Sequence, residues 1–188
     1  MIFIDDDVLP MPNFVAEHLR AARGRPDAVV RGAVIEVESF DRLPAPFWSL
    51  RNYSANWFWT SNVSVSRARL DDVRIGERMW FDETFSEYGW EDIELGLRLR
   101  EAGTRGVFNK RALAFHYKPK AMRSDPEQTE RRQRAQARTA RILAGKHPGW
   151  RARLATGDNP VQRSLYRAGR ALRLIGPNAY FEELERQG

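Results

Sequence analysis

The sequence predicts an α/β domain, with a mixed sheet flanked by helices and a basic helical extension at its C-terminus. Short runs rich in Val, Ile and Phe alternate with helical patterns, as in Ile2–Ile4, Ala28–Glu38 and Ala112–Phe115. Acidic residues or a histidine directly follow some of these runs, where α/β folds place their ligand sites. Residues 121–188 carry 14 Lys and Arg against 7 Asp and Glu. We therefore expect a body over residues 1–120 and a basic extension over residues 121–188.

Composition excludes several classes of protein. A length of 188 residues with 42% hydrophobic residues is enough for one domain with a core. The absence of cysteine excludes disulfide frameworks and thiolate metal sites. No apolar run approaches the length of a membrane span, and the first residues lack the pattern of a signal peptide. The expected location is the cytoplasm.

The first strand leads directly into three carboxylates. Ile2–Ile4 is short, apolar and β-prone, and Asp5, Asp6 and Asp7 follow it without a turn signal. Strand alternation places Asp5 and Asp7 on one side and Asp6 on the other. Two carboxylates on one side are a typical way to hold Mg²⁺ or Mn²⁺ against phosphate oxygens. The alternative is a solvated acidic turn.

Further elements follow from local patterns along the chain. A helix is expected over Phe14–Ala22, and a bend is expected at Gly32 in the strand over Ala28–Glu38. The remaining expected strands are Trp57–Ser66, interrupted at Ser61 and Asn62, then Gly106–Phe108, and Ala112–Phe115, which is followed by His116.

Residues 80–100 combine a dense group of carboxylates with aromatic side chains. Glu91 and Asp92 stand where a helix favours hydrogen-bond acceptors and negative charge. The helix is expected over residues 93–102 and ends before Gly103. Glu94 and Arg98 are four residues apart in the favourable order, so we expect them on its solvent-exposed side.

The extension contains two predicted helices. Residues 124–127 form a capping box with proline in the first turn, which predicts a helix over residues 126–144. A second helix begins at Pro160 and ends near Gly176, and it alternates apolar residues with arginines. One interpretation packs it on the body with a solvated arginine face. The other places it against an anionic membrane surface.

The order of these motifs resembles the second half of the family 2 glycosyltransferases. The likeness covers residues 1–119: a strand ending in DxD, an Asn-centred turn before Ser-x-x-Arg, FDE-x-F, GWEDIELGLRL-x-x-x-G, and a strand ending in histidine. The resemblance implies the GT-A fold, a Rossmann-like nucleotide-sugar-binding sandwich. It also implies metal-dependent, inverting transfer of a sugar from a nucleotide sugar to an acceptor hydroxyl, with Mn²⁺ or Mg²⁺ as cofactor.

The resemblance also implies roles for individual residues. It implies a metal site of Asp5, Asp7 and His116. The implied catalytic carboxylates are Asp92, as general base, and Glu91 beside it. Side chains implied to contact donor or acceptor are Asp6, Trp59, Asn62 and Trp90. Each assignment has a plainer alternative: His116 as an ordinary strand-end histidine, Asp92 as a helix cap, and the two tryptophans as core residues.

Two departures from the family pattern shape the functional hypotheses. The two glycines that usually precede Phe81-Asp82-Glu83 are absent, and residues 78–80 are Arg, Met and Trp. DxD begins at Asp5, so the chain is expected to be the C-terminal portion of the enzyme, truncated before a nucleotide-binding half. Its first strand would then be open to an N-terminal partner chain or a dimer. An isolated chain of this kind is expected to be inactive.

The hypotheses also differ in the partners that they require. A glycosyltransferase needs a nucleotide-sugar donor and a saccharide or lipid-linked acceptor, as in cell-envelope polysaccharide synthesis, with contact at the inner face of the membrane. One alternative is a non-catalytic remnant or subunit of a split enzyme. The other is a nucleic-acid-binding module that uses the arginine-rich tail. No nucleic acid is expected, because the tail has few aromatics and no recognised binding motif.

Overall fold

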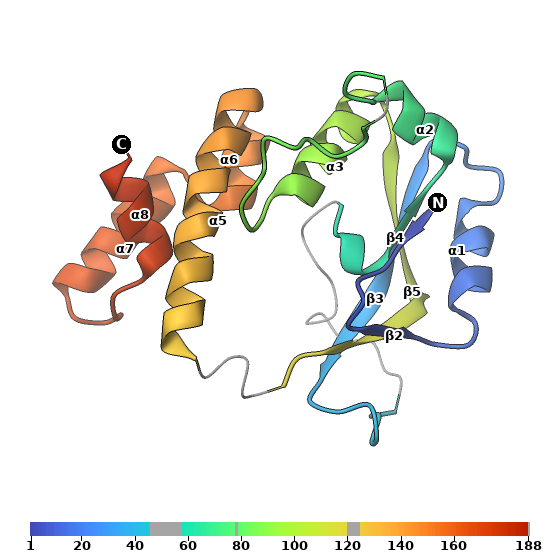
Figure 1. The fold of residues 1–188 in the computed structure, drawn as a ribbon, viewed down its shortest axis with the longest axis horizontal. Helices are drawn as coiled ribbons and strands as arrows, with labels where there is room; N and C mark the ends of the chain where they lie inside the picture. The colour runs from blue at the N-terminus through green and yellow to red at the C-terminus, as the bar shows by residue number, and fades with distance from the viewer. Residues whose placement is uncertain (46–57, 78, 120–124, 188) are drawn as a thin grey trace. The chain divides into compact units, whose positions relative to one another are not determined.

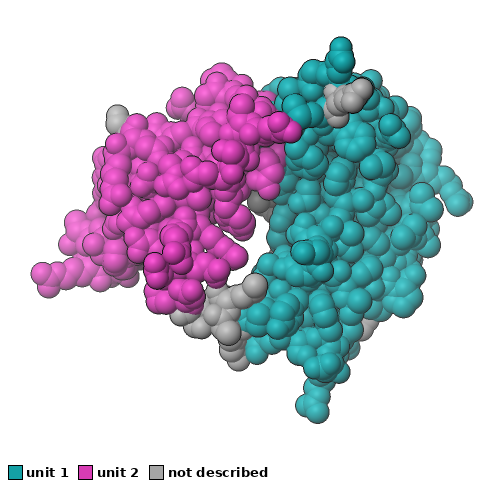
Figure 2. Space-filling model, in the orientation of Figure 1, with its two compact units in different colours: residues 1–81, 92–124 teal, residues 82–91, 125–188 magenta. Residues whose placement is uncertain are grey.

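The computed structural model describes residues 1–45, 58–77, 79–119 and 125–187, which form two compact units (Figure 2). The first, here called the sheet unit, comprises residues 1–81 and 92–124. The second, here called the helical unit, comprises residues 82–91 and 125–188. Residues 82–91, which the sequence places in the body, thus pack with the helices of the tail.

The sheet unit is built on a mixed five-stranded sheet with the order β1-β4-β3-β5-β2 (Figure 1). Only β3 and β5 are parallel; the other neighbours are antiparallel. The strands are β1 (Ile2–Phe3), β2 (Val8–Pro10), β3 (Ala28–Val37), β4 (Val63–Val65) and β5 (Arg105–Tyr117). The helices are α1 (Phe14–Ala22), α2 (Arg67–Asp72) and α3 (Glu91–Glu101), with a 3-10 turn, η2, at Thr60–Asn62. This confirms the predicted fold class, a mixed α/β sheet flanked by helices and consistent with a partial Rossmann-like fold.

The sheet is curled, and the first ten residues contribute its two edge strands, β1 and β2, which pair with different neighbours. β1 pairs with β4, with Ile2 opposite Ser64, whereas β2 pairs with β5, with Val8 opposite His116. The chain passes between them through a turn that the backbone N–H of Val8 closes on the carbonyl of Asp5, at 3.2 Å. The acidic run is therefore a turn between two edge strands, and the expected strand alternation does not apply to it.

Helices α1 and α3 cover opposite faces of the sheet. On β4, Ser64 bonds to His18 of α1 at 2.8 Å, whereas Val63 and Val65 pack into the cluster that contains Leu95 and Leu99 of α3. Successive strand residues point to opposite faces, so the two helices must lie on different sides. The side of α3 carries the larger apolar core, whose buried residues are Val29, Phe58, Val63, Val65, Leu70, Leu95 and Leu99.

The two short strands expected near the end of the body are one strand, β5, with an irregularity in its pairing. The register against β3 shifts between Gly32 and Ala33, so Gly32 lies opposite Asn109 and Ala33 opposite Leu113. The amide nitrogen of Asn62 donates to the carbonyls of Ala33 and Ala112, both at 2.9 Å. A Cβ at residue 32 would lie 1.9 Å from the Ala112 oxygen, so this close approach requires glycine.

The expectation that Glu94 and Arg98 lie on the exposed side of their helix is wrong. The side chain of Glu94 is 3% exposed and that of Arg98 is 15% exposed, and their nearest ion-pair atoms are 2.8 Å apart. Arg98 also donates to the carbonyls of Val73 and Trp80. The sequence spacing identified the ion pair correctly. The loop before α3 nevertheless covers the pair, because the backbone carbonyls of that loop take their hydrogen bonds from Arg98.

The helical unit contains α5 (Pro126–Lys146), α6 (Trp150–Thr156), α7 (Pro160–Ala171) and α8 (Ala179–Arg186). Asp125 is the N-cap of α5, with Pro126 in the first turn, close to the predicted start. Ala137 and Ala140 of α5 pack against Leu184 of α8. In the described parts of the chain, no helix is long and apolar enough to span a bilayer.

The acidic segment 82–91 is held by the basic helix α5 through ion pairs. Arg138 binds Glu87, and Lys146 binds Asp82 with 2.7 Å between Nζ and Oδ2. The hydroxyl of Thr84 donates to the other oxygen of Asp82 at 2.7 Å. Carboxylates from the acidic group in residues 80–100 thus neutralise part of the positive charge of the tail.

The Asp82 contacts predict that part of the stability of the chain is lost in acid. Burial alone would raise the pKa of Asp82, but Lys146 and Thr84 outweigh it and lower that pKa to about 2. A lowered carboxyl pKa stabilises the fold at neutral pH, here by about 2 kcal/mol, and this contribution disappears as pH falls from about 4 to about 2. We expect Asp82→Asn to lower the free energy of unfolding by that amount at pH 7, as measured by urea titration.

The pH profile provides the control for this prediction. The difference between wild type and Asp82→Asn should shrink towards zero as the pH approaches 2, because wild-type Asp82 is then protonated as well. Glu83→Gln, at the exposed neighbouring position, should differ little from wild type at any pH. A difference for Asp82→Asn that stays constant from pH 7 to pH 2 would contradict the electrostatic explanation.

Candidate metal centre

Asp5, Asp7 and His116 meet in the sheet unit. One ligand atom from each lies within 4.8 Å of the others. The pairing of β2 with β5 causes this, because it sets Val8 opposite His116, and the N–H of Tyr117 donates to the carbonyl of Asp7 at 2.9 Å. The turn between β1 and β2 then carries Asp5 to the same place. An octahedral ion with bonds of about 2.1 Å holds its ligand atoms about 3 to 4 Å apart, so these three side chains are close enough to close on one ion with a small movement.

The state of His116 supports a ligand at this position. The side chain is 4% exposed, and neither ring nitrogen has a well-aligned hydrogen bond among the described residues. Nε2 nevertheless lies 3.0 Å from Oδ1 of Asp7. Two polar atoms this close, without hydrogen-bond alignment between them, are compatible with a cation bound by both. Without such a ligand, the buried ring nitrogens would need a hydrogen-bond donor or acceptor. Imidazole and carboxylate ligands suit Mn²⁺, and carboxylates suit Mg²⁺.

The two carboxylates have opposite pKa shifts. Burial raises the pKa of Asp5, assisted by the negative charge of Asp7, although His116, Lys118 and a hydrogen bond from Thr60 oppose the rise. Burial would also raise the pKa of Asp7, but Lys118 and His116 outweigh it, so the pKa of Asp7 is lowered. Two acids with different proton affinities therefore share one site, a distribution that often marks functional positions.

The sequence reasoning missed two residues of this group. Lys118 follows β5 directly, and its Nζ lies 3.1 Å from Oδ2 of Asp7. Thr60, in the turn before β4, bonds to Asp5. The signal for Lys118 was its position two residues after His116, at the same strand end. Nothing in the sequence distinguished Thr60 from other threonines.

The side chains predicted to contact substrate lie in different settings. The ring of Trp59 stands 6.2 Å from that of His116, centre to centre, so it borders the metal-ligand group. Asp6 is exposed in the same turn. Asn62 is 3% exposed, and its amide bonds to His18 as well as to the carbonyls at the β3–β5 irregularity. The structure thus gives Asn62 a packing function; its contact with a sugar stays a prediction.

Glu91 and Asp92 are the first residues of α3, which begins two residues before the predicted start at Ile93. The N–H of Ile93 donates to Asp92 Oδ1 at 2.7 Å, which is compatible with a helix-start function. Oε2 of Glu91 is buried without a hydrogen-bond partner among the described residues. Trp90 has a positive φ of 74° and donates its indole N–H to the carbonyl of Gln136 at 2.8 Å, within the helical unit. Positive φ is unfavourable for a bulky residue, so packing must hold it there.

Comparison with known proteins finds glycosyltransferases that are similar to part of this chain. The chain is 53% identical over 47 residues to validoxylamine A glucosyltransferase of Streptomyces hygroscopicus subsp. jinggangensis (strain 5008), which is 25% of this chain and 10% of that protein. It is 35% identical over 69 residues to the uncharacterized glycosyltransferase YfnE of Bacillus subtilis (strain 168), which is 36% of this chain and 16% of that protein. These relatives are glycosyltransferases.

The chain spans only 10% and 16% of the length of the two relatives described. No protein-family model matches it.

Proposed function

We propose that the chain is part of a family 2 glycosyltransferase that transfers a sugar from a nucleotide sugar to an acceptor hydroxyl with inversion. The observation that carries this proposal is the meeting of Asp5, Asp7 and His116, beside Lys118 and Trp59. A donor of this class has a diphosphate, and a site with two carboxylates, an imidazole and an ammonium group is suited to bind it through a divalent cation.

The residues of the sheet unit would act mainly on the leaving group. Bound Mn²⁺ or Mg²⁺ would supply positive charge against the two phosphates of the donor. Asp5, Asp7 and His116 would hold that cation, while the Nζ of Lys118 adds a further positive charge beside Asp7. The bond between the anomeric carbon and the diphosphate oxygen breaks, so negative charge grows on the phosphates as these groups stabilise it. Trp59 offers an aromatic face for the sugar.

The acceptor hydroxyl needs a base, which we assign to Asp92. Its carboxylate takes the hydroxyl proton as the acceptor oxygen attacks the anomeric carbon, and Glu91 assists from the preceding position. The buried, unpartnered Oε2 of Glu91 supports a polar group binding at this helix start. Further contacts to donor or acceptor are assigned to Asp6 and Asn62.

The acceptor is proposed to be a saccharide or a lipid-linked saccharide of cell-envelope synthesis. A lipid-linked acceptor would require contact with a membrane surface. Exposed apolar side chains on the helical unit support such contact, among them Trp150 at 67% and Leu165 at 66% exposed. Arg173 lies between the exposed Leu172 and Leu174, and anionic lipids attract such a group.

Cation binding tests whether Asp5, Asp7 and His116 form a metal site. We expect the 188-residue chain to bind Mn²⁺ in a calorimetric titration, and Asp7→Ala to weaken that affinity by about 10–100-fold or more, since it removes a ligand. Asp72→Ala, at an exposed acid of the same unit, is the control and should bind as wild type does. Equal Mn²⁺ affinity for Asp7→Ala and wild type would mean that the acidic run is only a turn, and would remove the basis of the proposal.

A further inference from the structure

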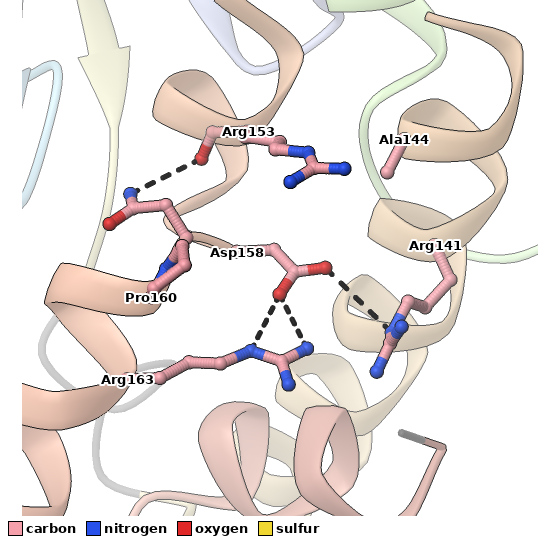
Figure 3. A pocket seen from close by; sticks show the side chains of 7 residues that line it. Arg141, Ala144, Arg153, Asp158, Pro160 and Arg163 are labelled. Carbon is pink, nitrogen blue, oxygen red and sulfur yellow. Dashed lines mark hydrogen bonds and ion pairs between the residues drawn. The ribbon is translucent and has the colours of Figure 1, made fainter. Parts of the chain in front are cut away.

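The helical unit contains a second polar site, in which arginines from three helices surround a cavity of about 260 Å³ (Figure 3). Its charged lining residues are Arg141 of α5, Arg153 of α6, Arg163 of α7 and Asp158 before α7. Arginine stays protonated at any working pH, so three arginines and one carboxylate leave a net charge of +2. None of these residues belongs to the candidate metal centre.

Two of the three arginines are fixed by Asp158. Arg163 Nε donates to its Oδ1 at 2.7 Å, and Arg141 Nε lies 3.7 Å from its Oδ2. The Asp158 side chain is only 9% exposed, and those of Arg163 and Arg141 are 22% and 33% exposed. The arginines are therefore partly shielded from solvent, where a charge pair is worth more than it is on an open surface. Their positions are also fixed before any ligand arrives.

Arg153 is the unpaired member of this group. Its guanidinium has no hydrogen bond or ion pair with any other described residue, and it points from α6 into the space beside Ala144 of α5 (Figure 3). Asp158 is already shared by Arg141 and Arg163. The fold thus holds three like charges around one space with a single counter-charge, and an incoming anion would relieve their repulsion.

We propose that this cavity binds a phosphate group carrying two negative charges. Guanidinium groups match the oxygens of phosphate in paired hydrogen bonds, and a dianion would neutralise the net charge of +2. The volume is below the roughly 300–1,000 Å³ of sites for drug-sized ligands, so the site takes a phosphate group itself rather than a whole nucleotide.

Such a phosphate could come from a soluble phosphate ester or from a lipid headgroup. The helices that carry Arg153 and Arg163 also carry exposed apolar side chains, which would suit a headgroup at a bilayer surface. Those at least 60% exposed on α6 and α7 are Trp150, Leu154, Val161 and Leu165. Both sources share the same phosphate chemistry at the cavity, and the experiment below separates them.

The test compares two arginines of the same helix. Arg153→Gln removes the unpaired guanidinium, whereas Arg151→Gln removes one that lies over the ring of Trp150, 5.2 Å from its centre, outside the cavity lining. Because Arg153 makes no side-chain bond among the described residues, its replacement should leave the circular dichroism of the full 188-residue chain unchanged. Inorganic phosphate is titrated calorimetrically at constant ionic strength, with chloride as the reference salt.

We expect phosphate to bind wild type and Arg151→Gln alike, and Arg153→Gln at least about tenfold more weakly. Asp158→Asn, if its circular dichroism matches wild type, should bind phosphate more tightly because a competing carboxylate is gone. Equal weakening by Arg151→Gln and Arg153→Gln would overturn the proposal, since it would show diffuse attraction to a basic surface.

A vesicle arm identifies the source of the phosphate. Sedimentation is measured with phosphatidylcholine vesicles and with vesicles that also contain phosphatidic acid, whose headgroup is a phosphate monoester. Binding to the acidic vesicles that Arg153→Gln abolishes supports a headgroup ligand. Binding of free phosphate alone, with the same dependence on Arg153, supports a soluble ester. Absence of both, or binding of both phosphate and acidic vesicles that ignores Arg153→Gln, overturns the proposed cavity site.

Discussion

Replacing Glu94 by alanine is expected to lower the free energy of unfolding of the sheet unit by about 3–5 kcal/mol. The substitution leaves the guanidinium of Arg98 largely buried without its carboxylate, and removing one partner of a buried pair costs more than the pair contributes. Arg98 also holds the carbonyls of Val73 and Trp80, so the loop before α3 should loosen. Urea unfolding followed by tryptophan fluorescence measures the loss, and proteolysis of the loop reports the loosening.

An exposed pair with the same spacing provides the control. Arg67 and Asp71 are also four residues apart on a helix, but the Arg67 side chain is 72% exposed and the ion-pair atoms are 3.7 Å apart. Arg67→Ala should therefore cost at most about 1 kcal/mol. The double variant Glu94→Leu with Arg98→Met removes both charges and should recover part of the loss. If Glu94→Ala and Arg67→Ala lowered the free energy of unfolding by similar amounts, burial of the Glu94–Arg98 pair would not explain the effect of Glu94→Ala.

Replacing Asp92 by asparagine is expected to lower the rate of sugar transfer by about 10²–10⁴-fold, the usual contribution of a positioned general base. Asparagine keeps the size and hydrogen-bonding capacity of the side chain but cannot take a proton. The measurement is release of nucleoside diphosphate from a panel of nucleotide sugars with acceptor, in a form of the protein that carries this chain and shows turnover. The loss should appear in kcat, with the KM for the donor little changed.

Two further readouts separate catalysis from structure at this position. Mn²⁺ affinity should be the same in Asp92→Asn and wild type, because the proposed cation ligands are Asp5, Asp7 and His116. Glu91→Gln should retain more activity than Asp92→Asn, since Glu91 only assists in the proposed mechanism. Two outcomes would contradict the assignment of Asp92 as the base. In one, Asp92→Asn keeps the full kcat; in the other, it loses both kcat and Mn²⁺ affinity, which indicates a structural function at the helix start.

Several features of this chain could be predicted from the sequence because they depend on neighbours a few residues apart. The helix Phe14–Ala22 has the bounds that the start and stop signals Asn13 and Gly24 predict, although Asn13 makes no side-chain cap bond. Helix α5 begins beside Asp125 and Pro126, as its capping signal predicts. The strand over residues 28–37 follows from a β-branched run, and a helix start within two residues of the predicted Ile93 follows from the acids at its N-terminus. The resemblance to the family 2 glycosyltransferases, and not local pattern, indicated Asp5, Asp7 and His116 as one group of side chains, and the structure brings them together.

Only the tertiary structure determined what depends on pairings between distant parts of the chain. Asp5, Asp7 and His116 meet because Val8 pairs with His116 across the sheet, and that register also brings Lys118, two residues after His116, to Asp7. Burial of Glu94 follows from loop carbonyls about twenty residues away in sequence, and the acidic segment 82–91 joins the tail through Lys146 and Arg138. Propensity and capping act within one turn of chain, whereas strand register, burial and charge pairing are decided by which distant surfaces pack together.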